Sequence, residues 1–232
     1  MLLFDQHFPD HIIACTSDQS CDFALCDEKG DLSEDQKVFL SRQLKIDIPK
    51  PLCVHQVHGS AIICADQEYL SRERGIPEAD GLLTDVSNVP LGIRTADCLP
   101  VFLWDTRNNC IGIVHAGWRG TLENIILKAL GLMAGRWKSS LEDIKVVLGP
   151  SIRSCCYEVG EKFQEYFPKQ VTSWQGRYYF DLAGENYNQL IDFGVKKINI
   201  FDCQVCTCCD RNYFSHRRDQ TSKRMISLMM LR

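Results

Sequence analysis

Residues 111–135 read IGIVHAGWRGTLENIILKALGLMAG and decide the fold class. Three of the first four residues are β-branched, as is typical of a strand, and the glycine-containing turn HAGWRG follows them. From Thr121 to about Gly135 the apolar side chains recur at the spacing of an amphipathic helix. These side chains are Leu122, Ile125, Ile126, Ala129, Leu130 and Met133. A strand that leads into such a helix indicates a sheet with helices packed over it.

The same alternation extends outward from this stretch. Short β-branched or aromatic runs predict further strands at His11–Cys15, Ile62–Ala65, Pro90–Arg94, Val101–Trp104, Lys145–Leu148 and Ile198–Phe201. A capping box of Ser33 and Gln36 opens a helix that runs through about Leu44, and another helix is predicted over Leu182–Phe193, ended by Gly194.

No repeat, low-complexity stretch or linker divides the 232 residues. We therefore expect one mixed α/β domain over residues 1–232. The polar stretch Gln67–Ala79 is expected to be a surface loop that could lie over a site.

The composition is that of a soluble globular protein, 45% hydrophobic and 24% charged. A formal net charge of −4 provides no broad attraction to nucleic acid or to an anionic membrane, so neither is an expected partner. No apolar run approaches the roughly 18 residues of a membrane span. The first residues also lack the pattern of a signal peptide, so we expect a cytoplasmic protein.

The chain contains thirteen cysteines, and this odd number argues against a complete disulfide framework. In a reducing compartment most of them should be free thiols. The run CQVCTCC at residues 203–209 contains a CxxC pair, but no second pair lies at the spacing of a zinc ribbon. We expect a strand end with free thiols there. The adjacent Cys155 and Cys156 are not expected to bind each other or one metal easily.

Three segments place chemically active residues where a strand gives way to a turn. They are VHQVHG at 54–59, RTADCLP at 94–100 and VHAGWRG at 114–120. His58, Cys98 and His115 together offer two imidazoles and a thiolate, a good ligand set for Zn²⁺ that leaves a fourth position open. His55 competes with His58, but His58 falls in the turn at Gly59, the better place for an open site.

Other interpretations of these residues remain open on spacing alone. A buried cysteine beside two hydrogen-bonded histidines is the more common outcome of such wide spacings. Alternatively, Cys98 and His115 form a nucleophile–base pair, with Asp97 or another carboxylate orienting the imidazole, as in a cysteine hydrolase.

The turn before the predicted helix also suits an anion. Gly117 and Gly120 let the backbone approach a ligand closely, and Arg119 offers a planar set of donors. With the helix N-terminus at Thr121, these groups predict a site for phosphate or carboxylate. The basic run His216-Arg217-Arg218 is either a solvated tail or a segment that reaches back to an anionic substrate.

The motifs VHQVHG, EADGLLTD, RTADCLP, HAGWRG, LGPSI with CCYEVG, and FSHRRD together resemble the laccase-domain (YfiH-like) family, from about Pro51 to Met225. The resemblance implies a layered α/β sandwich, similar to bacterial toxin deamidases that use a Cys–His pair. Members of the family are described as zinc-containing purine nucleoside phosphorylases, with adenosine deaminase and methylthioadenosine phosphorylase activities. They were formerly regarded as copper polyphenol oxidases, and some are linked to peptidoglycan editing.

The resemblance places the metal ligands of the family on His58, Cys98 and His115. It implies supporting catalytic roles for Asp97 and Arg119. The expected protein is a zinc-dependent phosphorylase of purine nucleosides, with Cu²⁺ as the other suitable metal. Phosphate, the co-substrate, is expected near Arg119, Gly120 and Thr121.

Three alternative interpretations accompany this expectation, and the motifs also depart from the family in places. The alternatives within enzymes are a cysteine hydrolase or amidase acting on a cell-wall precursor and a copper polyphenol oxidase. A metal-binding protein without activity is the third alternative. The N-terminal region lacks the Arg-then-Gly-Gly and Asn-Leu-Gly stretches of the family, and FSHRRD replaces its FSYRRD. These departures affect the expected substrate more than the chemistry.

Overall fold

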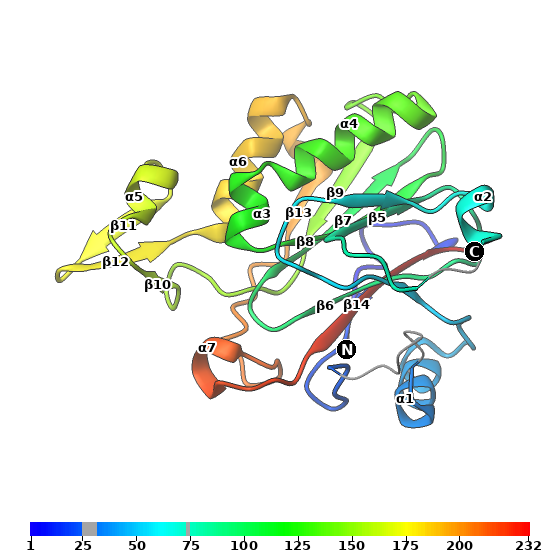
Figure 1. Ribbon diagram of the computed structural model, residues 1–232, viewed down its shortest axis with the longest axis horizontal. Helices are drawn as coiled ribbons and strands as arrows, with labels where there is room; N and C mark the ends of the chain where they lie inside the picture. Colours follow the sequence, from blue (N-terminus) through cyan, green and yellow to red (C-terminus); the bar gives the residue numbers. More distant parts are fainter. Residues whose placement is uncertain (25–31, 73–74) are drawn as a thin grey trace.

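Two sheets form the body of the molecule in the computed structural model, which describes residues 1–24, 32–72 and 75–232 (Figure 1). Within these residues the larger sheet has six strands in the order β13 (Ile200–Asp202), β9 (Ile144–Leu148), β7 (Leu99–Asp105), β8 (Ile111–Ala116), β5 (Gly81–Thr84) and β4 (Ile62–Cys64). The smaller sheet has five, in the order β1 (Leu2–Leu3), β2 (Ile12–Thr16), β14 (Met225–Leu231), β6 (Leu91–Thr95) and β3 (Leu52–Cys53). Both sheets mix parallel and antiparallel pairs.

Alternating side chains of β7 show how the layers pack. Phe102 and Trp104 point into a core shared with the smaller sheet, while Val101 and Leu103 face a second core on the other side. The helices α4 (Ile125–Trp137) and α6 (Leu182–Phe193) cover that second side, and α1 (Glu34–Leu44) packs on the outer face of the smaller sheet (Figure 1). The expected mixed α/β layered sandwich is confirmed.

A third, separate sheet projects from the body, drawn in yellow at the left of Figure 1. It consists of β10 (Glu158–Val159), β12 (Arg177–Phe180) and β11 (Val171–Trp174), with the short helix α5 (Phe163–Tyr166). The turn between β11 and β12 uses Gln175 and Gly176, both with positive φ, as a tight hairpin turn requires. We call this unit the hairpin sheet.

Several sequence predictions hold at the level of single elements. The Ser33 capping box is present, because the Ser33 hydroxyl accepts from the Gln36 amide and the Gln36 side chain accepts from the Ser33 amide. The helix over Leu182–Phe193 ends at Gly194 in the left-handed conformation, as predicted. None of the helices in the described part of the chain is long and apolar enough to cross a membrane.

Other predictions differ from the structure. The helix expected from Thr121 is two helices, α3 (Trp118–Leu122) and α4, because Asn124 adopts a left-handed conformation with φ of 58° between them. The stretch Gln67–Ala79 contains the helical turn α2 (Gln67–Leu70). The start of the strand expected at Ile198–Phe201 is a 3₁₀ turn, η1 (Lys197–Asn199). The helical turn α7 (His216–Asp219) and the long strand β14 were not expected.

Candidate metal centre and its cavity

His58, Cys98 and His115 come together at one end of the larger sheet. Cys98 directly precedes β7, and His115 lies in β8 opposite Pro100, so the antiparallel pairing brings the thiol and the imidazole together. His58 arrives from the loop after β3. The ligand atoms of the three side chains lie within 4.8 Å of one another, and the two imidazole rings meet edge to face with centroids 4.9 Å apart.

Unusual backbone conformations hold two of the turns that form this centre. His58 has φ of 60° and Asp97 has φ of 88°, values that cost conformational energy for residues other than glycine. Gly117 lies against the centre, where an added Cβ would be 3.4 Å from the Cys98 sulfur and 3.4 Å from the His58 ring. These side chains therefore come together through locally strained backbone and close packing.

Asp80, fully buried just before β5, orients the centre. Its carboxylate accepts a hydrogen bond from Nδ1 of His115 at 2.7 Å and from the backbone amides of His58 and Gly59 at 3.0 and 2.7 Å. Because Nδ1 of His115 is occupied, Nε2 is the atom that could bind a metal, an arrangement common around metal-binding histidines. Burial would raise the pKa of Asp80, but His115 and the two amides outweigh it and lower that pKa.

The centre favours a thiolate at Cys98. Burial alone would raise the pKa of Cys98, but the adjacent His115 and His58 lower it to about 6. Conversely, Cys98 and Asp80 overcome the effect of burial on His115 and raise its pKa to about 9. A thiolate beside a histidine suits both a metal ligand and a nucleophile.

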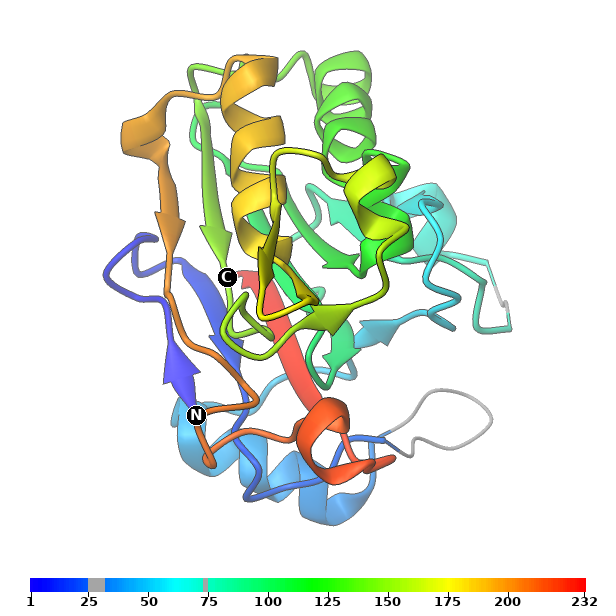
Figure 2. The ribbon, with the colours of Figure 1, turned by 90° about the vertical axis from the view of Figure 1, so that its left-hand side faces the viewer.

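A cavity of about 640 Å³ opens over the three side chains. This volume lies in the range of sites that hold small organic ligands. Basic side chains on its wall are His55, Arg94, His216, Arg217 and Arg224, and apolar or aromatic ones are Ile152, Tyr157 and Leu182. Figure 2 shows α7, which carries His216 and Arg217, below the hairpin sheet on the face turned toward the viewer. None of the described residues of 67–79 lines this cavity, so the expectation that this stretch could lie over the site has no support from them.

Asp97 has a different position from the one expected for an imidazole-orienting carboxylate. Its oxygens accept from the hydroxyls of Thr207 and Ser215 at 2.6 and 3.1 Å and from the Arg217 amide at 2.7 Å. Asp97 therefore fastens the C-terminal segment to the turn that carries Cys98. The carboxylate that orients His115 is Asp80, which sequence reasoning missed although it stands in the quoted motif EADGLLTD.

The residues expected to bind an anion lie outside the cavity lining. Arg119 is exposed, with its guanidinium 4.8 Å from the centre of the Trp118 ring. Gly120 packs so closely on Gly59 that an added Cβ would lie 2.6 Å from the carbonyl oxygen of that residue. Thr121 is buried and accepts from Nδ2 of Asn186 at 2.9 Å. The phosphate site at Arg119, Gly120 and Thr121 stays a prediction without support from the cavity geometry.

Fold and centre together define a class of protein, the layered α/β sandwich with an open His–Cys–His site. The chain belongs to the family described as multi-copper polyphenol oxidoreductase laccase, whose model matches residues 17–232. The crystal structure of YlmD from Geobacillus stearothermophilus superimposes with a TM-score of 0.83 at 26% identity, over 96% of this chain and 93% of that one.

Curated relatives of the chain are named for reactions of purine nucleosides. A purine nucleoside phosphorylase of Borreliella burgdorferi is 35% identical over 202 residues, 83% of this chain and 82% of the relative. One of Aquifex aeolicus is 37% identical over 154 residues, 66% and 71% of the two chains. Adenosine deaminase RL5, from an unknown prokaryotic organism, is 30% identical over 212 residues, 84% and 80% of the two chains.

Proposed function

We propose that this protein is a metal-dependent purine nucleoside phosphorylase whose centre is formed by His58, Cys98 and His115. The observation that carries the proposal is the convergence of these three ligands, with Asp80 behind His115, at the wall of a cavity of about 640 Å³. The names of the curated relatives support the choice of reaction.

The residues present fit a zinc ion. Two imidazoles and a thiolate are common zinc ligands, and a set of three leaves one position open to water or substrate. Cu²⁺ binds similar ligands and is the other candidate. When bound, zinc supplies Lewis acidity at the open position. Within the chain, Asp80 holds the tautomer and orientation of His115, and the histidines favour the thiolate of Cys98.

The cavity wall has an apolar part and a basic part, which meet where the Arg217 guanidinium lies 5.4 Å from the centre of the Tyr157 ring. Tyr157, Ile152 and Leu182 give an apolar surface for the purine ring, and the guanidinium groups of Arg217 and Arg224 can bind phosphate. In phosphorolysis a phosphate oxygen bonds to the anomeric carbon of the ribose while the bond from that carbon to the purine nitrogen breaks. The purine nitrogen takes up the proton that the hydrogen phosphate ion gives up, and the products are the free base and ribose 1-phosphate.

The test uses inosine, adenosine and methylthioadenosine, each with and without phosphate, with products resolved by mass spectrometry. Free base together with the sugar 1-phosphate, formed only when phosphate is present, is the expected result. Adenosine converted to inosine without phosphate would instead assign the chain to the reaction named for its relative RL5. No product from any of the three nucleosides would contradict the proposal.

One observation favours a second candidate, a cysteine hydrolase. Cys98, His115 and Asp80 follow one another as nucleophile, base and orienting carboxylate, the arrangement of a catalytic triad. This reaction needs no metal. Activity on amide substrates that resists chelators, together with covalent labelling of Cys98, would support it against the phosphorylase.

A further inference from the structure

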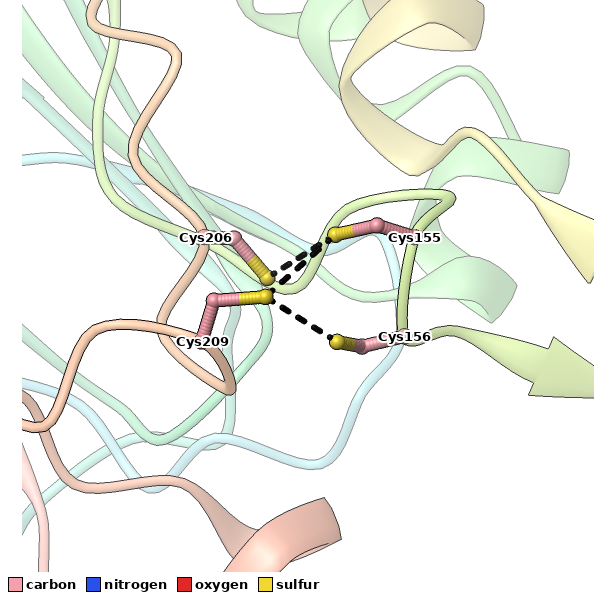
Figure 3. Close-up of side chains that lie close together, drawn as sticks. All are labelled: Cys155, Cys156, Cys206 and Cys209. Carbon is pink, nitrogen blue, oxygen red and sulfur yellow. Dashed lines mark hydrogen bonds between the residues drawn. The ribbon is translucent and has the colours of Figure 1, made fainter.

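A second group of cysteines lies outside the centre described above. Cys155 and Cys156, from the loop after β9, face Cys206 and Cys209, from the loop after β13 (Figure 3). The sulfur of Cys155 lies 3.5 Å from that of Cys206 and 3.6 Å from that of Cys209, and the sulfur of Cys156 lies 3.3 Å from that of Cys209. The sequence did not lead us to expect this grouping. We expected the adjacent Cys155 and Cys156 not to bind one metal easily, and about fifty residues separate them from Cys206 and Cys209.

We infer that Cys155, Cys156, Cys206 and Cys209 form a second metal site, a tetrathiolate centre that takes a single Zn²⁺ ion. The distances between the four sulfurs fit a single ion. Four sulfurs at about 2.3 Å from a tetrahedral zinc lie about 3.8 Å from one another. The four cysteine sulfurs are all within 4.8 Å of each other, and three of the pairs are between 3.3 and 3.6 Å apart. An iron–sulfur cluster places several atoms between its thiolates and would hold them farther apart.

The surroundings of Cys206 favour its thiolate form. Burial would raise the pKa of Cys206, but the backbone amides of Cys209, Arg153 and Cys208 and the adjacent Cys155 thiol lower it. Four thiolates this close together would repel one another strongly. A divalent cation removes that repulsion, as it does in structural sites with four cysteines.

The two loops are held together independently of the cysteines. Arg153 makes a bidentate ion pair with Asp202, with distances of 2.6 and 2.7 Å. The Ser151 amide donates to the Val205 carbonyl at 3.2 Å, and the Thr207 amide donates to the Ser151 carbonyl at 3.1 Å. The four sulfurs therefore belong to a pre-arranged site and do not depend on a chance approach of two loose loops.

The position of the tetrathiolate centre gives it a structural role beside the cavity. Tyr157, which lines the cavity, follows Cys156 directly. Thr207, between Cys206 and Cys209, donates to Asp97 next to Cys98. An ion that joins the two loops would fix both residues. We expect its loss to lower thermal stability and to raise KM, while the ligands His58, Cys98 and His115 keep their own metal.

Metal content of the purified, full-length protein tests this proposal. Elemental mass spectrometry measures the zinc content per chain of Cys206→Ser and Cys155→Ser. The matched control is Cys208→Ser, in the same loop but not one of the four grouped cysteines. We expect one zinc ion fewer per chain in both variants than in the control. Cys98→Ala should remove a different ion, so a failure of the proposed phosphorylase centre would be distinguishable.

A second measurement tests the proposal even if the cysteine variants fail to fold. Wild-type protein loaded with Co²⁺ should show the strong thiolate-to-cobalt absorption of a tetrathiolate site, and that absorption should persist in Cys98→Ala. Equal zinc in Cys206→Ser, Cys155→Ser and Cys208→Ser would overturn the proposal. So would an intact mass of the non-reduced wild type that shows disulfides among these four cysteines.

Discussion

At the scale of single residues, the carboxylate of Asp80 has the largest effect on the centre because it contacts two of its three parts. It accepts from the imidazole of His115 and from the backbone of the turn that carries His58. A charged acceptor in this position fixes the ring orientation and strengthens the imidazole as a ligand. The geometry of the centre therefore depends on a residue that is not one of the three candidate ligands.

Asp80→Asn tests this dependence. The amide has nearly the same shape but lacks the charge and one acceptor, so we expect zinc affinity to fall about 10–100-fold. Competition with a chromophoric chelator measures it. The control is Asp105→Asn, another fully buried aspartate that accepts from backbone amides, far from the centre. Equal affinity of the two variants would contradict the role assigned to Asp80.

Arg217 and Arg119 provide a second test at the residue scale. Arg217 lines the cavity and Arg119 does not. We expect Arg217→Ala to raise KM for phosphate about tenfold or more, the effect of losing a charge-assisted hydrogen bond of about 1.5–3 kcal/mol. Steady-state kinetics at saturating nucleoside measures it. A larger rise of the KM for phosphate in Arg119→Ala would instead support the phosphate site predicted from the sequence.

At the scale of elements, the turn between β7 and β8 positions Cys98 and His115 through the register of the two strands. Asp105 closes this turn by accepting from the amides of Arg107 and Asn108 at 2.8 and 3.0 Å. Burial would raise the pKa of Asp105, but the hydrogen bonds from Ser139, Asn108 and Arg107 lower it. Its ionised form therefore stabilises the folded state.

The sign of the pH effect follows from this lowered pKa. The contribution of Asp105 is complete above the unfolded pKa of about 4 and is lost as the pH falls through the lower folded value. We expect Asp105→Asn to be about 1–3 kcal/mol less stable than the wild type at pH 7, with the difference narrowing in acid. Urea unfolding at a series of pH values measures it. The exposed Asp85→Asn should follow the wild type, and a constant difference for Asp105→Asn would refute the argument.

How far the elements could be predicted depends on whether their signals are local. The Ser33 capping box and the end of α6 at Gly194 rest on contacts within a few residues, and both were predicted correctly. The break at Asn124 requires a left-handed residue that no local pattern indicated. The β11–β12 hairpin did carry a local signal, Gln175-Gly176 between aromatic and β-branched residues, which was overlooked.

The candidate site was predictable to a different extent. Cys98, His115 and His58 stand in motifs, so the sequence pointed to them directly. Asp80 gave no signal of its own, because only the fold shows which carboxylate reaches His115. The four grouped cysteines depend on two loops that meet in the tertiary structure.

Strand β14 was missed because its MISLMML run is buried throughout and lacks the alternation of a half-exposed strand.

At the scale of the whole molecule, the two main sheets are joined by the core between them. Phe102 of β7 is fully buried in that core, with its ring 5.0 Å from the ring of Phe4. Phe102→Ala should cost about 3–5 kcal/mol of unfolding free energy, because it leaves a cavity between the sheets. Urea denaturation measures this loss as a lower midpoint with an unchanged slope.

The comparison for this prediction is Phe193→Ala, in which the removed ring is 42% exposed. We expect it to cost less than about 1.5 kcal/mol, since little area returns to water. If the two variants were equally stable, the shared core would not be what joins the sheets.

The place of β14 between β2 and β6 has a consequence for biosynthesis. The strand is made from residues 225–231, whereas its two neighbours are synthesised more than a hundred residues earlier. While the ribosome is still adding the intervening residues, the facing edges of β2 and β6 have no partner and expose backbone donors and acceptors. Until residue 231 has emerged, these two edges can pair with other chains, so the nascent chain is more open to aggregation than the finished one.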